Sequence, residues 1–295
     1  MVMIRKGTIS GGEHGGRRLD DAVALLFDSI SKSEARRIID RGGCAVNSSM
    51  VRVASRAVKA GDIIEIGIME PGRFQELLLP PESLLYEDGN LIAVNKPAGV
   101  NTQRTPYQLK GTLEYWVSEY FRQQGMSEPA RVIHRLDRGT SGVMLFPKQK
   151  KAAAWLSKRF HDGLVEKRYL ALVSGRPGQD TWAVDGAIGK IGTSRYGVMP
   201  EGRSALTEFS LLATSGEYSL LEARPLTGRT HQIRVHLESC GLPIAGDSTY
   251  DGEPAARMML HCAELVFADD VGTLIRVNAP LDGAFEALIR EKGLS

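Results

Sequence analysis

The sequence predicts a two-domain protein of the α+β class. Its 295 residues exceed the size of one small domain and suit two. Segments with helical spacing and short apolar segments typical of strands are mixed along the chain, without the regular strand–helix–strand order that indicates a parallel α/β sheet. The stretch from Pro71 to Pro81 holds three prolines and a glycine. We therefore expect a linker over 71–82, between a small domain at 17–70 and a larger one at 83–295.

The small domain is predicted to contain two helices followed by short strands. Residues 1–16 precede it as a Gly-rich, flexible leader. The first helix is indicated by apolar residues at helical spacing, namely Leu19, Ala22, Val23, Leu26 and Phe27. The second helix begins at Ser31, which has capping-box spacing to Glu34, and ends at the glycines 42–43. Strands are expected over residues 45–46, 51–53 and 63–68.

The large domain is predicted to mix strands and helices. Short apolar runs indicate strands at 91–94, 169–173 and 219–223. Helical spacing indicates helices at 151–161 and 230–240. No segment repeats at a fixed period, which argues against a repeat protein.

Composition excludes several classes of protein. Hydrophobic residues make up 42% of the chain and charged residues 24%, as in folded globular proteins. No run approaches the roughly 18 apolar residues of a membrane-spanning helix. The N-terminus lacks the apolar core of a signal peptide, so we expect a cytoplasmic protein with no membrane partner. The three cysteines form no CxxC pair, which argues against a disulfide framework and a zinc site.

The first candidate site is the segment from His134 to Gly142, in which Asp137 is a single carboxylate between Arg135 and Arg138. Flanking cations favour the ionised form of a carboxylate, so Asp137 should be available for chemistry at neutral pH. The hydroxyl groups and glycines that follow suit a ligand held at close range. A loop with an ordinary Asp–Arg pair explains the same residues equally well.

Two further clusters could contribute to a site. In residues 226–236 a glycine turn leads into a helix start, where Arg229 and Thr230 could bind an anion. A capped amphipathic helix is the alternative there. Tyr169 opens an apolar strand, where a tyrosine is more often a core residue than a proton acceptor or a stacking surface. The Gly-Asp turn at 246–250 is more typical of structure than of catalysis.

Other catalytic patterns are missing or incomplete. The sequence has no Walker motif, no GxSxG motif and no GxGxxG after a strand. A two-carboxylate glycosidase is conceivable, but no partner carboxylate for Asp137 stands out. One acidic centre among basic residues suits a polyanionic substrate.

Six segments in order resemble the RluA-type pseudouridine synthases. Residues 134–142 resemble the HRLDxxTSG signature of that family. The other five resemble its KPxG turn, KxYxALV strand, TGRTHQIR segment, GDxxY turn and late LH pair, and they stand at 95–99, 167–173, 227–234, 246–250 and 260–261. The first domain is similar to the S-four RNA-binding domain. Its basic helix face, Arg37 and Arg41, fits contacts to phosphate, with a merely solvated face as the alternative.

The resemblance implies a mixed, largely antiparallel sheet in the catalytic domain and the isomerisation of uridine in RNA to pseudouridine. A uridine in folded RNA has to be flipped out to be reached. The reaction is neither a redox change nor a net hydrolysis, so we expect no metal and no cofactor. The expected partner is structured RNA, with large-subunit rRNA favoured over tRNA. No obligatory protein partner is implied, and a monomer suffices.

The resemblance also implies roles for individual residues. Asp137 is the catalytic aspartate, acting either as a nucleophile or by removing a ribose proton. Arg229 is the arginine paired with it. Tyr169 stacks on the base and is the candidate acceptor of the carbon 5 proton. Arg135 would fill the space left by the flipped base. The remaining RNA contacts predicted in this domain are His134, Arg138, Thr140 and Thr230.

The chain also departs from the family pattern. The differing positions are residues 100–104 after the KPxG turn, Asp251 after the GDxxY turn, Cys262 where alanine is common, and the turn at 47–49. None of these differences falls on Asp137, Tyr169 or Arg229, so they bear on which RNA is the substrate and not on the reaction. Two other functions stay open: a non-catalytic RNA-binding factor of ribosome assembly, and an RNA glycosidase that releases uracil.

Overall fold

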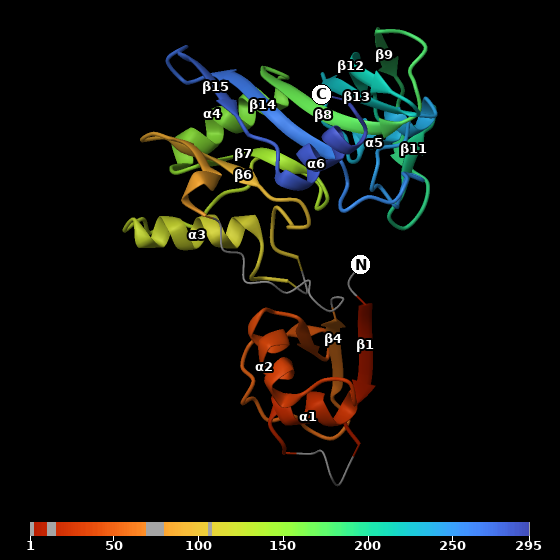
Figure 1. Ribbon diagram of the computed structural model, residues 1–295. Helices are drawn as coiled ribbons and strands as arrows, with labels where there is room; N and C mark the ends of the chain where they lie inside the picture. Colours follow the sequence, from red (N-terminus) through yellow and green to blue (C-terminus); the bar gives the residue numbers. More distant parts are fainter. Residues whose placement is uncertain (1–2, 11–15, 69–79, 106–107, 295) are drawn as a thin grey trace. The chain divides into compact units, whose positions relative to one another are not determined.

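A computed structural model describes residues 3–10, 16–68, 80–105 and 108–294 (Figure 1). They form two compact units. The first takes its residues from Met1–Leu78 and Gln103–Gln123, and the second from Leu79–Thr102 and Gln124–Ser295. The sequence did not predict that 103–123 would group with the N-terminal unit. Most of the predicted linker, residues 71–79, lies outside the described residues, as do residues 11–15 of the predicted leader.

A four-stranded antiparallel sheet, in the order β1-β4-β2-β3, forms the centre of the first unit. Its core contains the predicted apolar residues of both helices together with the inner residues of the sheet. The elements of this unit are β1 (Met3–Thr8), α1 (Leu19–Leu26), α2 (Lys32–Asp40), β2 (Cys44–Val46), β3 (Ser49–Met50), β4 (Ile63–Ile68) and α3 (Leu113–Gln123).

Helix α2 confirms the prediction made from its capping residue. Ser31 Oγ accepts a hydrogen bond from the Glu34 amide at 3.2 Å, which satisfies one of the free amides at the helix start. Gly42, with a φ of +77°, takes the left-handed conformation that ends the helix. On the predicted basic face, Arg37 is exposed and Arg41 is half-buried.

Two predictions for the first unit are wrong. Residues 3–8, predicted as part of a flexible leader, form strand β1 and pair with β4. An edge strand is held by backbone hydrogen bonds, and the side chains of β1 are exposed or half-buried, so no apolar alternation marks it. The strand predicted at 51–53 is instead β3 at Ser49–Met50. Asn47 and Ser48 both have positive φ and form a two-residue turn, so the chain pairs again earlier.

A nine-stranded sheet organises the second unit (Figure 1). Its order is β5-β6-β7-β14-β8-β13-β12-β9, with β15 also paired to β14. The pair β7–β14 is parallel and the others are antiparallel, which confirms the mixed, largely antiparallel α+β prediction. Strands β10 and β11 form a separate hairpin.

The first elements of this unit are a 3-10 turn (Pro81–Ser83), β5 (Leu84–Glu87), β6 (Leu91–Lys96), β7 (Ser141–Pro147), α4 (Lys150–His161), β8 (Val165–Ser174) and β9 (Thr181–Asp185). The others are β10 (Ile188–Lys190), β11 (Tyr196–Val198), β12 (Leu206–Ser215), β13 (Tyr218–Pro225), α5 (Gln232–Ser239), β14 (Leu260–Ala268), β15 (Leu274–Asn278) and α6 (Gly283–Glu291).

Strand β7 carries the first candidate segment into the centre of the sheet. All of its residues are buried. Gly142 has a φ of +115°, and a Cβ at this position would lie 2.1 Å from the carbonyl oxygen of Cys262 on β14. Only glycine allows this approach, so the sequence TSG fixes the end of the 134–140 loop against β14.

The structure confirms most of the predicted elements of the second unit. The strands expected at 91–94, 169–173 and 219–223 lie within β6, β8 and β13, and the helix expected at 151–161 is α4. The helix expected over 230–240 begins later, at Gln232, because His231 has a φ of 58°, which a helix does not accept. None of the helices in the described ranges has both the length and the apolar character required to span a bilayer.

Candidate active site

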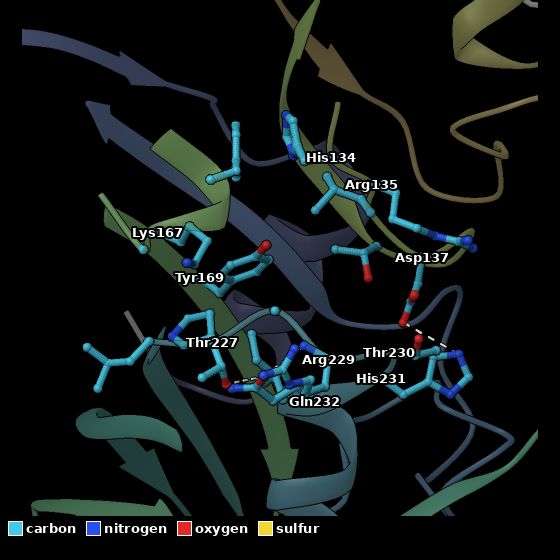
Figure 2. Close-up of a pocket in the computed structure, with 18 of the residues that line it drawn as sticks. His134, Arg135, Asp137, Lys167, Tyr169, Thr227, Arg229, Thr230, His231 and Gln232 are labelled. Atoms are coloured by element: carbon cyan, nitrogen blue, oxygen red, sulfur yellow. Dashed lines mark hydrogen bonds and ion pairs between the residues drawn. The ribbon is translucent and has the colours of Figure 1, made fainter. Parts of the chain in front are cut away.

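A cleft of about 630 Å³ in the second unit contains most of the predicted site residues (Figure 2). It lies between the 133–140 loop, the end of α4, strand β8 and the turn before α5. The predicted residues that line it are His134, Arg135, Asp137, Thr140, Tyr169, Arg229 and Thr230. Arg138 is not among the lining residues, and Arg37 and Arg41 belong to the other unit.

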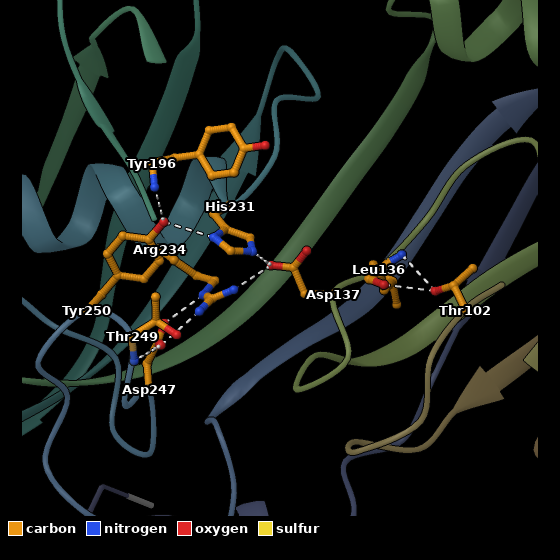
Figure 3. Close-up of polar contacts among 9 residues, drawn as sticks. All are labelled: Thr102, Leu136, Asp137, Tyr196, His231, Arg234, Asp247, Thr249 and Tyr250. Carbon is orange, nitrogen blue, oxygen red and sulfur yellow. Dashed lines mark hydrogen bonds and ion pairs between the residues drawn. The ribbon is translucent and has the colours of Figure 1, made fainter. Parts of the chain in front are cut away.

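Asp137 is held by two groups from the start of α5 (Figure 3). Arg234 Nη1 donates a hydrogen bond to Asp137 Oδ2 at 2.9 Å, and His231 Nε2 lies 3.8 Å from the same oxygen. Among the described residues, both contacts of this carboxylate fall on Oδ2. With its side chain 20% exposed, Asp137 can present Oδ1 to a molecule in the cleft.

Arg234 is itself fixed by a second carboxylate. Its Nε and Nη2 donate to Asp247 Oδ2 and Oδ1 at 2.6 and 2.9 Å, a bidentate pair. The Arg234 side chain is only 8% exposed. Burial alone would lower the pKa of Arg234, but the hydrogen bonds and charges of Asp247 and Asp137 raise it. The Gly-Asp turn, expected to be structural, therefore supplies the group that orients the partner of Asp137.

The arginine paired with Asp137 was predicted to be Arg229, and this prediction is wrong. Arg229 Nε donates to the carbonyl oxygen of Ser204 at 2.9 Å. Because the left-handed His231 ends the turn and the helix starts after it, Arg229 lies in the turn while Arg234 lies on the first helical turn. The sequence shows both arginines in one segment, but not where the helix begins.

Gln232, which sequence reasoning missed, fixes that turn. Its Oε1 accepts hydrogen bonds from Thr227 Oγ1 at 2.7 Å and from the Arg229 amide at 2.9 Å. Its Nε2 donates to the carbonyl of Leu206 and to Thr207 Oγ1. The buried amide is fully satisfied, so it fastens the turn to strand β12.

Tyr169 and Lys167 form the β8 side of the cleft (Figure 2). They are two residues apart on one strand and so share a face. Burial, with smaller effects of Cys262 and Asp137, raises the pKa of Tyr169 well above its usual value. The phenol is therefore protonated at neutral pH. Burial lowers the pKa of Lys167, a lining residue that the sequence reasoning did not select.

His134 and Arg138 both make contacts within the protein. The His134 ring stacks on Phe160 with centroids 4.3 Å apart, and its Nε2 accepts the Leu145 amide at 2.9 Å. Burial lowers the pKa of His134 to about 3, so the ring is a neutral packing group that borders the cleft. Arg138 Nε donates to the carbonyl of Gly99 at 2.8 Å, which ties it to the 95–99 turn.

Residues 96–102, which include most of that turn, hold the loop that carries Asp137 through hydrogen bonds. Thr102 Oγ1 donates to the Leu136 carbonyl at 2.8 Å and lies 3.2 Å from the Leu136 amide (Figure 3). The fully buried Lys96 Nζ donates to the carbonyls of Pro97, Val100 and Arg138 at 2.8 to 3.3 Å. Burial lowers the pKa of Lys96 to about 7. These bonds limit the freedom of residues 136–138 and hence of the carboxylate.

Ser141 on β7 and His261 on β14 connect the end of this loop to the C-terminal segment at Ala279. His261 Nε2 lies 3.1 Å from the Ala279 carbonyl, which can only accept, so Nε2 carries the proton. Nδ1 is then free to accept from Ser141 Oγ at 2.8 Å. His261 is 1% exposed, and burial lowers its pKa to about 4. The neutral form is the one that the fold requires.

We expect His261 to make the fold sensitive to acid. Between pH 6.5 and 4 the unfolded chain binds a proton at this residue that the folded chain excludes, so stability falls as the pH falls. By pH 4 this titration lowers the free energy of unfolding by about 3 kcal/mol. His261→Gln, whose amide can make both hydrogen bonds, removes this titration. Urea unfolding at several pH values should show that the free energy of unfolding falls less steeply with falling pH in the variant than in the wild type. The same pH dependence in both proteins would contradict the assignment.

No group of three or more histidine, cysteine, aspartate or glutamate side chains in the described part of the chain is arranged to hold a metal ion.

Comparisons with known proteins indicate one family for the chain. Residues 90–239 match the family described as RNA pseudouridylate synthase, and residues 17–64 match the S4 domain. The "Uncharacterized RNA pseudouridine synthase" of Aquifex aeolicus is 34% identical over 245 residues, which cover 79% of this chain and 76% of that protein. The "Ribosomal large subunit pseudouridine synthase C" of Vibrio parahaemolyticus is 30% identical over 296 residues, 93% of this chain and 92% of that protein.

Solved structures show the same fold. "Human RNA Pseudouridylate Synthase Domain Containing 1" is 28% identical, with a TM-score of 0.58 over 77% of this chain and 98% of that chain. "Human RNA Pseudouridylate Synthase Domain Containing 4" has a TM-score of 0.63 over 72% of this chain and 94% of that chain, at 23% identity.

Proposed function

The chain belongs to the RNA pseudouridylate synthase family, and we propose that it converts specific uridines of large-subunit ribosomal RNA to pseudouridine, with Asp137 as the catalytic aspartate. Its activity is thus that of an RNA pseudouridine synthase, an isomerase. The observation that carries the role of Asp137 is its geometry. Arg234 orients one carboxylate oxygen at 2.9 Å, and the other is available in the same cleft as Tyr169.

The proposed reaction exchanges one bond of the ribose for another. The bond between ribose carbon 1 and uracil nitrogen 1 breaks, the base turns, and carbon 5 bonds to ribose carbon 1. The hydrogen of carbon 5 leaves as a proton, and nitrogen 1 gains one, so the composition of the nucleotide is unchanged. Asp137 either attacks as a nucleophile through Oδ1 or removes a ribose proton. Arg234 orients the carboxylate for either route through its hydrogen bond to Oδ2.

The other lining residues suit a nucleotide. Tyr169 is proposed to stack on the base, which fits a neutral phenol. The raised pKa of Tyr169 argues against a phenolate that is ready to take the carbon 5 proton, so that role stays a prediction. Arg135 is exposed at the edge of the cleft, where a planar cation can fill the space of a flipped base. Thr230 and Arg229, in the turn before α5, are proposed to contact the flanking backbone.

The choice of rRNA rests on the relatives and on the first unit. One relative that matches over most of both chains is named for the large ribosomal subunit. We propose residues 17–70 as an accessory RNA-binding domain, with Arg37 and Arg41 as phosphate contacts, and residues 83–295 as the catalytic domain. A second binding domain favours a large, structured RNA. Transfer RNA is the alternative substrate.

The test uses unmodified large-subunit rRNA with tritium on carbon 5 of its uridines. The label has to leave when carbon 5 becomes the glycosidic carbon, so its release reports the reaction directly. We expect release by the wild type and none by Asp137→Ala. Release from tRNA alone would overturn the rRNA proposal. Tight binding of both RNAs without release would indicate an assembly factor, and free uracil would indicate a glycosidase.

A further inference from the structure

Tyr250 is the one described side chain that contacts both partners of Asp137, and we propose that it is a positioning residue for the catalytic carboxylate (Figure 3). This inference rests on the function proposed above. The Tyr250 side chain is 1% exposed and is not among the residues that line the cleft. Any influence on the reaction is therefore exerted through other residues.

The hydroxyl group of Tyr250 connects His231 to the β10–β11 hairpin. The Tyr196 amide, on β11, donates to Tyr250 Oη at 3.1 Å. His231 Nδ1 lies 2.8 Å from the same oxygen. An amide can only donate, so the hydroxyl oxygen is an acceptor there. The hydroxyl hydrogen of this buried residue also needs an acceptor, and among its described contacts His231 Nδ1 is the group that can accept it. His231 Nδ1 is then an acceptor, and the proton of the neutral ring sits on Nε2.

This tautomer suits the neighbouring carboxylate. His231 Nε2 is the atom that lies 3.8 Å from Asp137 Oδ2, so the N–H dipole is directed at a negative oxygen. A second cation beside Arg234 is unfavourable, and burial lowers the pKa of His231, which keeps the ring neutral. His231 also holds a left-handed backbone conformation, with a φ of 58°, that costs free energy for a residue other than glycine. The bond to Tyr250 stabilises the ring in the orientation that this backbone gives it.

The ring of Tyr250 supports the second partner. The guanidinium carbon of Arg234 lies 4.8 Å from the ring centroid, within the range of a cation–π interaction. Arg195, which pairs with Glu238 and Asp251, lies 5.4 Å from the same centroid. One buried side chain thus orients Arg234 through its face and His231 through its hydroxyl. The two functions can be separated, because phenylalanine keeps the ring and removes only the hydroxyl.

The experiment is a double-variant cycle on tritium release. We expect Tyr250→Phe to lower kcat about 10- to 100-fold, as loss of an orienting partner does, with KM for the RNA unchanged. If Tyr250 acts through His231, the double variant Tyr250→Phe/His231→Gln loses no more than His231→Gln alone. Tyr86→Phe is the matched control, because it removes a tyrosine hydroxyl bonded to Asp88 at 2.9 Å, away from the cleft. This control should retain wild-type kcat.

A second measurement does not depend on activity. In protein labelled with 15N-histidine, the ring nitrogen shifts of His231, assigned by their loss in His231→Gln, should show a proton on Nε2. In Tyr250→Phe the proton should stay on Nε2, because Asp137 is unchanged, but the Nδ1 resonance should move downfield, since Nδ1 no longer accepts a hydrogen bond. An unchanged Nδ1 resonance, additive losses in the cycle or an unchanged kcat in Tyr250→Phe would each overturn this inference alone. Absence of wild-type turnover on any RNA, with the Nδ1 shift observed, would instead overturn the proposed function.

Discussion

Replacing Asp137 by asparagine is expected to lower pseudouridine formation roughly 10⁴-fold or more, to the limit of detection. Asparagine keeps the size of the side chain and can still accept the hydrogen bond from Arg234 Nη1, but it is neither a nucleophile nor a base at neutral pH. The measurement is tritium release from rRNA under single-turnover conditions, which separates the chemical step from product release.

The same variant should not lose stability. Arg234 is shared by two carboxylates, Asp137 and Asp247, so the buried cluster carries more negative than positive charge. Removing one negative charge leaves a balanced pair, and we expect an unchanged or slightly higher Tm. RNA affinity should also be retained. Asp270→Asn, which breaks a surface ion pair with Lys151 at 2.9 Å, is the matched control and should keep full activity. Substantial turnover by Asp137→Asn would refute the assignment of the catalytic group.

The sequence predicts best those features that are local. Helix α2 follows from Ser31 and the apolar spacing of Ala35, Ile38 and Ile39, because capping and burial act within one turn or two. Strand β1 could not be predicted, since it is held by backbone hydrogen bonds to β4, more than fifty residues away, and buries little of its own side chains. A pairing of this kind leaves no periodic signal.

The site shows the same limit. The position of Asp137 follows from its motif, but the choice between Arg229 and Arg234 depends on where α5 starts. That start depends on the left-handed backbone of His231, a conformation that is uncommon for residues other than glycine and that tertiary contacts stabilise here. The second carboxylate, Asp247, comes from a separate segment whose proximity only the fold reveals. The proposed reacting group, Asp137, could thus be selected from the sequence, whereas Arg234 and Asp247, which orient it, could not.

Replacing Arg234 by methionine is expected to reduce both activity and stability. Methionine fills part of the volume but leaves Asp137 and the 2% exposed Asp247 without their cation. Removing one partner of a buried ion pair typically costs about 3–5 kcal/mol. Turnover should fall at least about 10²-fold, because the aspartate loses its orienting hydrogen bond. Thermal unfolding and tritium release measure the two effects. Arg229→Met should be far milder, since the hydrogen bond of the Arg229 side chain within the described residues goes to an uncharged group, the Ser204 carbonyl.

The double variant Arg234→Met/Asp247→Asn separates stability from catalysis. Neutralising Asp247 removes the buried charge that methionine leaves unpaired, so part of the lost free energy of unfolding should return. Activity should not return, because Asp137 Oδ2 still lacks the hydrogen bond from Arg234. Recovery of turnover together with stability would mean that Arg234 serves the fold alone. An Arg229→Met variant as inactive as Arg234→Met would mean that the turn before α5 moves when RNA binds and brings Arg229 to the carboxylate.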